Sequence, residues 1–132
     1  MEKNIVLIGF MGSGKTSIGK KLSITLKREF IDMDDFIENK EGMSINDIFK
    51  TKGEPYFREL EKELCQRFAQ PKSKIIATGG GVIKSDVNVV NLKKGGIVAI
   101  FTVIVIAAVI IVIIAVIITV IIAAVIVIII IP

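Results

Sequence analysis

The residues most able to do chemistry form a glycine-rich stretch at positions 9–16, with the sequence GFMGSGKT. Glycines let backbone N–H groups approach a polyphosphate closely, because no Cβ stands in the way. A helix that begins behind them adds partial positive charge and unpaired N–H donors. The Lys15 ammonium could then reach the β- and γ-phosphates of a nucleotide, and the Thr16 hydroxyl could bind Mg²⁺. The alternative interpretation is a plain glycine turn with a solvated Lys15.

The elements around this stretch favour a P-loop. An apolar strand is expected at residues 4–8, before the glycines, and a helix at residues 15–28, after them. Residues 30–32 read as a second short strand, so strand, helix and strand form a βαβ unit with parallel strands. The residues that would hold the nucleotide are Gly12, Ser13, Gly14, Lys15, Thr16 and Ser17.

Three aspartates lie at the end of this second strand, in the stretch DMDD at residues 32–35. Parallel α/β sheets bind their ligands at the carboxyl ends of the strands. One carboxylate there could hold Mg²⁺ through water, and another could accept a proton from a substrate hydroxyl. An aspartate could instead cap the next helix, expected at residues 36–40. We expect this capping role for Asp35, whereas the evidence of the bare sequence is balanced for Asp32 and Asp34.

An arginine with two nearby glutamates forms a second candidate group. Arg58 lies in a helix expected from residue 55 to before Pro71, within about one turn of Glu54 and Glu61. This spacing by itself favours a solvated salt bridge within the helix, worth a few tenths of a kcal/mol.

A glycine triplet forms a third candidate group. A strand expected at residues 74–78 runs straight into Gly79, Gly80 and Gly81. A flexible loop is one interpretation. At this end of a strand in a P-loop protein we favour a backbone that closely approaches a ligand. A short helix at residues 86–92 and a fourth strand at 97–101 are expected to follow.

Composition bounds the possible functions. The chain has 132 residues, a net charge of +4 and no histidine, which excludes histidine-based catalysis and histidine metal sites. The mild positive charge fits anionic small molecules as well as nucleic acid, so it decides neither. Cys65 is the only cysteine, and we expect it to be a buried, inert thiol. Because a strand is expected so close to the N-terminus, we expect no signal peptide.

The end of the chain differs in kind from the rest. All 30 charged residues lie in the first 94, and residues 102–131 use only Ile, Val, Ala and Thr. Nothing in this tail turns the chain, and it shows neither a strand period nor a helix period. A membrane-spanning helix flanked by Lys93 and Lys94 is the formal alternative, but the uncharged run is much longer than one span. We hypothesise that these letters are placeholders for natural side chains that the sequence does not show.

About residues 3–101 resemble the shikimate kinases, a branch of the P-loop proteins related to the nucleoside monophosphate kinases. The motifs that carry the resemblance are, in order, GFMGSGKT at residues 9–16, FIDMD at 30–34, FRELE at 57–61 and GGGV at 79–82. The first motif alone is common to the superfamily. The four together, at these spacings, are specific to the family.

The resemblance implies a three-layer α/β/α fold with a central five-stranded parallel sheet. Residues 1–101 would form the P-loop kinase core, with a mobile substrate-binding subdomain at about residues 33–61. Residues 102–132 would stand for the lid and the C-terminal part of the same domain. The implied reaction transfers the ATP γ-phosphoryl group to the 3-hydroxyl of shikimate, in the route to chorismate and the aromatic amino acids. The implied enzyme is cytoplasmic and monomeric, needs Mg²⁺, and binds neither nucleic acid nor a membrane.

The resemblance also implies roles at the phosphate end of the site. Lys15 would bind phosphate and stabilise the transferring group, so it counts as catalytic. Thr16 would bind Mg²⁺, and Asp32 would hold the ion through water. Phosphoryl transfer mainly requires positioning and charge neutralisation, and these residue types supply both.

At the substrate end, the resemblance implies that Asp34 meets the shikimate hydroxyls and is the catalytic base for the attacking one. Arg58 would grip the substrate carboxylate and be oriented by Glu61, which reverses the interpretation from spacing alone. The glycine triplet, residues 79–81, would line the shikimate pocket.

The sequence departs from the family after the glycine triplet. The family has a lid arginine over the ATP phosphates and a later arginine on the shikimate carboxylate, but no arginine follows Arg67 here. Without a lid that closes, activity would be largely lost. Two competing functions stay open: a P-loop kinase for gluconate or a nucleotide, and a non-catalytic nucleotide-binding module anchored in a membrane by residues 97–131.

Overall fold

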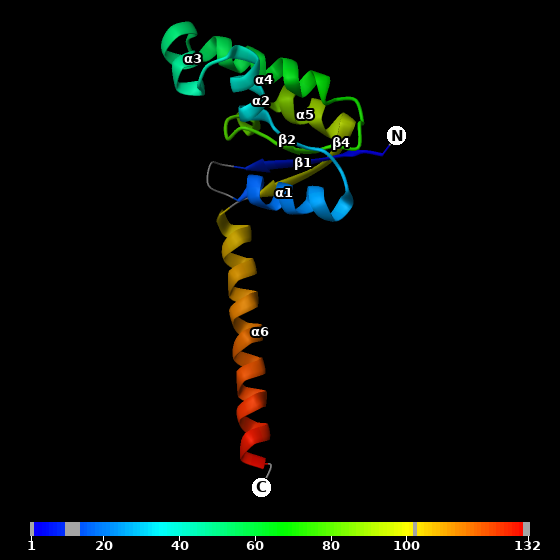
Figure 1. Cartoon of the computed structure of the whole chain (residues 1–132), viewed down its shortest axis with the longest axis vertical. Coiled ribbons are helices and arrows are strands. Elements are labelled where there is room, and N and C mark those ends of the chain that lie inside the picture. Colours follow the sequence, from blue (N-terminus) through cyan, green and yellow to red (C-terminus); the bar gives the residue numbers. More distant parts are fainter. Residues whose placement is uncertain (1, 10–13, 102, 131–132) are drawn as a thin grey trace. The chain divides into compact units, whose positions relative to one another are not determined.

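The computed structural model describes residues 2–9, 14–101 and 103–130 (Figure 1). The chain divides into two compact units, residues 1–101 and residues 102–132. The first unit holds a parallel sheet with its helices, and the second holds one long helix in its described part.

The described strands of the first unit form one parallel sheet. They are β1 (Asn4–Gly9), β2 (Phe30–Asp32), β3 (Ile75–Ala77) and β4 (Gly96–Phe101), in the order β2-β3-β1-β4. Val6 of β1 pairs with Ile76 on one side and with Val98 on the other, and Ile76 pairs in turn with Ile31. Because all four strands run the same way, their carboxyl ends meet at one edge of the sheet.

The number of strands differs from the expectation. The parallel sheet and the three layers are confirmed, but the described sheet has four strands rather than five. After β4 the chain forms a continuous helix from residue 103 to residue 130, without a turn that could bring a further strand back to the sheet. In the described part of the chain, β4 therefore pairs only with β1.

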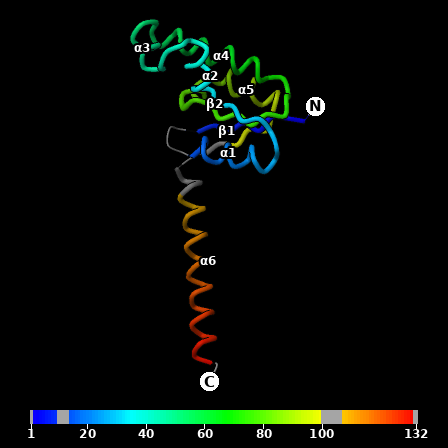
Figure 2. Tube along the Cα trace, viewed as in Figure 1, coloured from blue at the N-terminus to red at the C-terminus, as the bar shows by residue number. Residues whose placement is uncertain are grey.

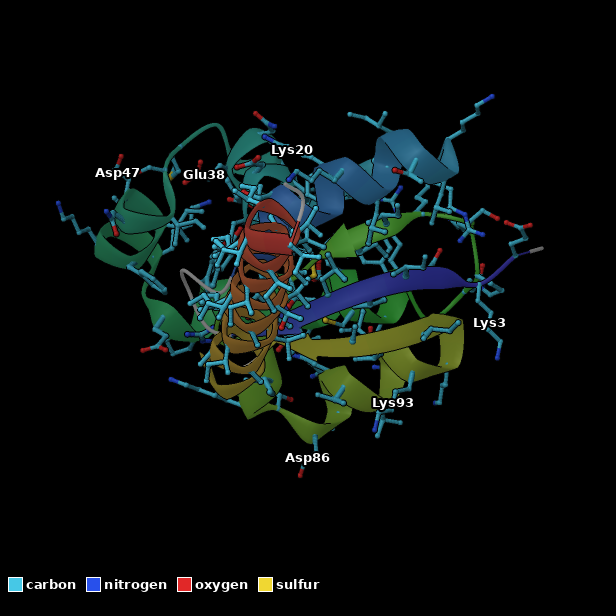
Figure 3. The ribbon with its side chains drawn as sticks, turned by 90° about the horizontal axis from the view of Figure 1, so that it is seen from below. Lys3, Lys20, Glu38, Asp47, Asp86 and Lys93 are labelled. Carbon is cyan, nitrogen blue, oxygen red and sulfur yellow. The ribbon has the colours of Figure 1, made fainter. Side chains whose placement is uncertain are left out.

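Helices cover both faces of the sheet. They are α1 (Lys15–Leu26), α2 (Met33–Glu41), α3 (Ile45–Lys52), α4 (Glu54–Arg67) and α5 (Asp86–Gly95), with a 3₁₀ turn, η1 (Val82–Lys84). Figure 1 shows α1 on one face of the sheet and α4 and α5 on the other. In the trace of Figure 2, α2 and α3 lie on the same side of the sheet as α4 and α5. Exposed charged side chains such as Lys3, Asp86 and Lys93 project from the outside of the unit (Figure 3).

The core lies between the sheet and the helices on the α4 side. An apolar stripe on α4 and its C-cap residue is buried, and its members are Phe57, Leu60, Leu64 and Phe68. They form one cluster with strand residues such as Val6 and Ile76. Cys65 is fully buried in the same cluster, and burial raises the pKa of its thiol to about 12. A thiol this hard to ionise is inert, as expected.

Helix α2, which carries the aspartates, begins earlier than expected. It begins at Met33 rather than Phe36, and its N-cap is Asp32. The Asp32 side chain accepts hydrogen bonds from the backbone N–H groups of Asp34 and Asp35. The capping role expected for Asp35 is therefore wrong, because the strand runs directly into the helix and the first aspartate satisfies its free donors.

The second unit consists of helix α6 (Val103–Ile130) in its described part. Its described side chains, from residue 107 onward, are exposed, and the helix carries no polar face. By length and composition, residues 107–130 could cross a membrane, with a mean hydropathy of 3.7. Within this unit the helix buries none of its apolar side chains, so packing does not explain its composition.

A buried asparagine at the start of β1 organises the connection between α4 and β3. Asn4 is fully buried, and its amide Nδ2 donates to the carbonyl oxygens of Phe68 and Gln70, at 3.3 and 3.1 Å. Its Oδ1 accepts from the backbone N–H groups of Lys72 and Lys74, at 2.9 and 3.1 Å. One side chain thus satisfies four backbone groups in a segment that forms no strand or helix.

We predict that Asn4→Ala lowers the free energy of unfolding by about 2–4 kcal/mol, because it leaves buried backbone donors and acceptors unpaired. Chemical denaturation monitored by far-UV circular dichroism measures this change. The control is Asn39→Ala on the exposed face of α2, for which a change within about 0.5 kcal/mol is expected. Equal effects of the two substitutions would contradict the role given to Asn4.

Candidate active site

The candidate site lies at the edge of the sheet where the strands end. Gly9 ends β1, Asp32 ends β2, and the glycine triplet at residues 79–81 follows β3 after one residue. Because the strands are parallel, the P-loop, the start of α2 and the triplet meet at this edge. Arg58 of α4 lines a cavity at this edge together with Asp34 and the triplet.

The described end of the P-loop has the geometry that the motif requires. Gly14 is the N-cap of α1, and its φ of 85° lies in the left-handed region that favours glycine. Lys15 follows at the start of the helix and is only 8% exposed. Its Nζ donates a hydrogen bond of 2.7 Å to the carbonyl oxygen of Gly9. The ammonium is therefore held at the carboxyl end of β1, the side of the sheet where the motif needs a cation for a phosphate.

The other predicted nucleotide ligands are described only in part. Thr16 and Ser17 are exposed in the first turn of α1, so both are accessible to a ligand. Gly12 and Ser13 lie outside the described residues.

A hydroxyl and a carboxylate meet where the motif predicts Mg²⁺. The Thr16 hydroxyl donates a hydrogen bond of 3.0 Å to Oδ2 of Asp32, whose Oδ1 caps α2. Both groups are oxygen ligands of the kind that Mg²⁺ prefers, and this ion usually keeps several waters and phosphate oxygens around it. The described residues contain no group of three or more acidic, histidine or cysteine side chains suited to a metal, as expected for such a water-rich site. Thr16 and Asp32 therefore fit Mg²⁺.

Two ionisable groups at this edge have shifted pKa values. Burial raises the pKa of Asp34, and the negative charge of Asp32 raises it further, while the Lys15 ammonium opposes the shift. Burial lowers the pKa of Lys15, against the attraction of Asp34 and Asp32. A carboxylate with a raised pKa accepts a proton more readily near neutral pH. The charge of the P-loop lysine is thus felt at Asp34, which links the phosphate end of the site to its other end.

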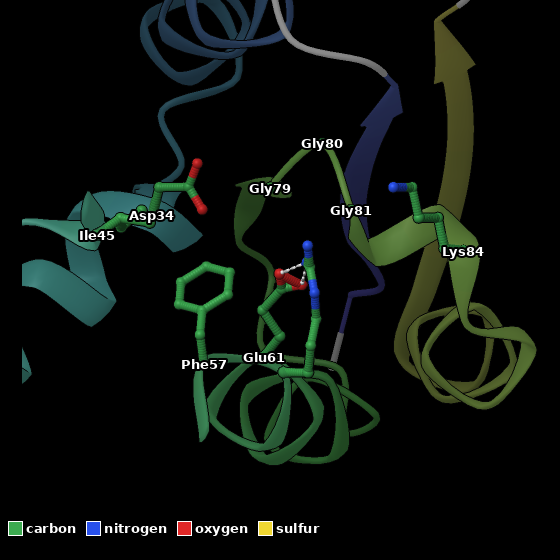
Figure 4. Close-up of a pocket in the computed structure, with 9 residues that line it drawn as sticks. Asp34, Ile45, Phe57, Glu61, Gly79, Gly80, Gly81 and Lys84 are labelled. Carbon is green, nitrogen blue, oxygen red and sulfur yellow. Dashed lines mark hydrogen bonds and ion pairs between the residues drawn. The ribbon is translucent and has the colours of Figure 1, made fainter. Parts of the chain in front are cut away.

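Next to Asp34 lies a cavity of about 310 Å³ (Figure 4). Five lining residues are those predicted from the sequence, namely Asp34, Arg58, Gly79, Gly80 and Gly81. Four others were not assigned to the pocket from the sequence, namely Ile45, Phe57, Glu61 and Lys84. The cavity therefore has an aspartate at one side, an arginine at another, and a backbone of glycines between them.

Arg58 is held by two carboxylates from its own helix. Its Nη1 donates to Glu61, at 2.5 and 3.0 Å from the two carboxylate oxygens, and its Nε and Nη2 donate to Oε1 of Glu54, at 3.2 and 3.0 Å. The Glu61 side chain is 2% exposed, whereas that of Glu54 is 65% exposed. Burial raises the pKa of Glu61, although the charge of Arg58 opposes this rise. The salt bridge expected from spacing is present, and a guanidinium with five N–H donors still has at least one left for a ligand.

The glycine triplet makes room for the two charged side chains of the cavity. A Cβ on Gly79 would lie 2.7 Å from Oδ1 of Asp34, and a Cβ on Gly81 would lie 2.1 Å from Nη1 of Arg58. Both distances are far below a normal contact, so a side chain at either position would force Asp34 or Arg58 to move from its present place. The close approach expected of this backbone therefore involves side chains of the protein itself.

Sequence reasoning missed the apolar wall of the cavity. Phe57 packs edge-to-face on Phe49 with ring centroids 5.0 Å apart, and Ile45 lines the cavity from the start of α3. The sequence analysis includes Phe57 only as part of the FRELE motif, because a pattern along a helix does not reveal where the helix meets a cavity. No local signal marks Ile45 or Lys84, since only the packing of α3 and η1 brings them to the cavity.

Comparison with known proteins gives consistent matches. A family model described as shikimate kinase matches residues 11–109. The shikimate kinase of Caldanaerobacter subterraneus subsp. tengcongensis is 49% identical over 98 residues, which are 74% of this chain and 57% of that protein. That of Alkaliphilus oremlandii is 51% identical over 98 residues, 74% of this chain and 58% of that protein. The chain thus spans about half the length of the curated relatives it matches.

Solved structures match in the same way. A shikimate kinase from Acinetobacter baumannii in complex with shikimate superimposes with a TM-score of 0.72 at 42% identity, over 76% of this chain and 56% of that one. The Aquifex aeolicus shikimate kinase gives a TM-score of 0.69 at 39% identity, over 74% of this chain and 61% of that one.

We predict that Gly81→Ala displaces the Arg58 guanidinium and lowers the free energy of unfolding by about 1–3 kcal/mol through overpacking. Denaturation of the variant measures the cost, and the chemical shift of the arginine Nε–H group in NMR reports the displacement.

The control is the same substitution in an Arg58→Ala background. If the clash with Arg58 causes the loss, Gly81→Ala should cost almost nothing once that side chain is gone, which a double-mutant cycle measures directly. An equal cost in both backgrounds would show that the glycine is needed for another reason.

Proposed function

This chain belongs to the shikimate kinase family, and on that basis we propose that its first unit carries the nucleotide and substrate sites of a kinase that phosphorylates shikimate. The reaction transfers the γ-phosphoryl group of ATP to the 3-hydroxyl of shikimate and yields shikimate 3-phosphate and ADP. The proposal includes its place in the route to chorismate and the aromatic amino acids.

One observation carries this proposal. Lys15 begins α1 after β1 and donates to the carbonyl oxygen of Gly9, whereas Asp34 lies at the start of α2, directly after β2, and shares a cavity with Arg58. Both side chains thus belong to the carboxyl edge of one parallel sheet, where a phosphate held at Lys15 would lie beside a hydroxyl held at Asp34. This is the arrangement that in-line phosphoryl transfer needs, since catalysis of this reaction rests on positioning and charge neutralisation.

At the phosphate end, we propose that the described P-loop residues bind ATP and that Thr16 and Asp32 hold Mg²⁺. The ion, when bound, would neutralise charge that develops on the phosphate oxygens. Lys15 would turn from the Gly9 carbonyl to the phosphate, exchanging a hydrogen bond to a neutral oxygen for one to a charged oxygen, which is stronger. Gly12 and Ser13 complete the proposed set of nucleotide ligands.

At the substrate end, we propose that Asp34 accepts the proton of the attacking hydroxyl. Its raised pKa supports this role, because a weakly acidic carboxyl is the better base. Arg58 would bind the carboxylate of shikimate, with Glu61 fixing its orientation. The glycine triplet would form the floor between the two groups, and the shikimate complex of the Acinetobacter relative supports a site of this kind.

We further propose that the enzyme is cytoplasmic and monomeric, and that it binds small molecules rather than nucleic acid or a membrane. The shikimate complex of the Acinetobacter relative supports a small-molecule ligand, and the mild net charge of +4 is compatible with one. A core at residues 1–101 with a substrate-binding subdomain at about 33–61 stays part of the proposal.

We also propose that the letters written at residues 102–132 are placeholders for the natural residues of the lid and of the C-terminal part of the domain. The family match ends at residue 109, while the relatives extend well beyond the matched part. The uniform apolar surface of α6 supports this interpretation, because no part of the described helix resembles the charged, turn-rich first unit. Its length and hydropathy favour a membrane anchor as the competing function.

We predict that Asp34→Asn lowers the rate of shikimate phosphorylation by at least about 100-fold, because the base is lost. ATP binding should be unchanged, and the rate with gluconate or a nucleoside monophosphate should be negligible for both proteins. A coupled ADP-release assay and isothermal titration with ATP measure these quantities. Turnover of the variant at the wild-type rate would rule out the role of Asp34.

The same variant should be more stable at neutral pH. Because the pKa of Asp34 is raised on folding, the unfolded chain releases its proton first, and the free energy of unfolding falls as pH rises from the ordinary value of 3.8 through the folded pKa. Asparagine at this position cannot ionise, so the variant does not lose this part of the free energy of unfolding as pH rises. Loss of activity with a gain in denaturation midpoint separates a functional role of Asp34 from a structural one.

We predict that the intact mass of the natural protein differs from the 14.4 kDa of the written sequence. Mass spectrometry of the purified protein tests this, and tryptic peptides from the first 94 residues, which should match the sequence, provide the control. Detergent phase partitioning should place the protein in the aqueous phase. A mass of 14.4 kDa together with recovery in the detergent phase would favour the membrane-anchored module instead.

A further inference from the structure

A lysine beside the glycine triplet lines the same cavity as Arg58 and Asp34 but takes no part in the roles described so far. Lys84 is the last residue of η1, the 3₁₀ turn that directly follows the triplet, and it lines the cavity. Figure 4 shows its side chain extending from η1 toward the segment at Gly81. It also lines an adjoining cavity that shares Arg58 and Gly81 with the first. Lys84 and Arg58 therefore line two adjoining cavities together with Gly81.

The charge of Arg58 is already balanced before any ligand arrives. Glu61 contacts Nη1 of Arg58 at 2.5 Å, and Glu54 contacts Nη2 at 3.0 Å. One cation thus faces two carboxyl groups. A ligand carboxylate at Arg58 would receive hydrogen bonds, but it would also be repelled by the two glutamates that hold the arginine.

Lys84 carries positive charge that the described residues do not neutralise. Among the described residues, no carboxylate lies in ion-pair contact with Lys84, and its side chain is exposed. Lys62, which lines only the adjoining cavity, is instead paired with Glu59 at 3.3 Å. A flexible stem with three N–H donors lets Lys84 follow a ligand into the cavity.

We propose that Lys84 supplies an additional positive charge for the carboxylate of the substrate, beside Arg58 and apart from the later arginine that the family places there. The inference rests on the proposed function and adds a residue to it. In this arrangement Arg58 orients the carboxylate through directed N–H donors, and Lys84 offsets the repulsion from the two glutamates. Lys84 thereby makes the cavity selective for a hydroxylated acid over the corresponding neutral compound.

A binding experiment with two ligands separates this role from a structural one. Isothermal titration would measure the dissociation constants of shikimate and of its methyl ester, which keeps the ring hydroxyls but lacks the carboxylate charge. The proteins are the wild type, Lys84→Ala, Lys84→Arg, and the control Lys62→Ala, which removes an equal charge from the neighbouring cavity.

We expect Lys84→Ala to weaken shikimate binding about tenfold, the size of a lost charge-assisted contact. Binding of the methyl ester should be unchanged, because the ester has no charge to lose. Lys84→Arg should restore most of the shikimate affinity. Lys62→Ala should change it by no more than about twofold, since Lys62 belongs to an exposed pair.

Equal shikimate affinity of the wild type and Lys84→Ala would overturn the inference while leaving the proposed function in place. An equal loss for the acid and its ester would also overturn it, because Lys84 would then act on the shape of the cavity rather than on charge. If the wild type binds neither ligand, the proposed function fails, and the inference fails with it.

Discussion

One carboxylate connects the two halves of the site, and the rest of the arrangement depends on it. Oδ1 of Asp32 caps helix α2, which carries Asp34, and Oδ2 accepts a hydrogen bond from Thr16 on helix α1. The helix that follows the P-loop and the helix that carries the proposed base are thereby fixed to one side chain. Burial is the main cause of the raised pKa of Asp34, and the negative charge of the same aspartate adds to it. Asp32 thus positions Asp34 and also contributes to its proton affinity.

The site holds charge in places where burial works against it. Burial raises the pKa values of Asp34 and Glu61 and lowers that of Lys15, so each charged form is less stable there than in water. The protein offsets this cost with close partners rather than with solvent, as the contact between Arg58 and Glu61 illustrates. Such a site trades stability for chemistry, which is common where ionisable groups must act.

Glycine has a specific purpose in this architecture. At Gly14 it permits the left-handed turn at the start of α1. At Gly79 and Gly81 it gives space to Asp34 and Arg58, which come from two different helices. The triplet therefore couples the end of β3 to both helices. This chain spans about half the length of its curated relatives. The contacts between the triplet, Asp34 and Arg58 lie wholly within the described part of the first unit.

The sequence by itself determined the P-loop and the parallel order of strand and helix, because backbone preference and apolar spacing act over a few residues. The group formed by Asp34, Arg58 and the glycine triplet came instead from the resemblance to the shikimate kinases, since spacing alone left Asp34 open and favoured a solvated salt bridge for Arg58. The tertiary structure alone decided that Asp32 rather than Asp35 caps α2, that Asn4 satisfies a distant loop, and that Lys84 lines the cavity. The contacts of Asn4 and the position of Lys84 join segments far apart in the chain, for which spacing along the sequence carries no signal. The cap of α2 is a local contact, and it was missed because the strand runs into the helix without the expected interval.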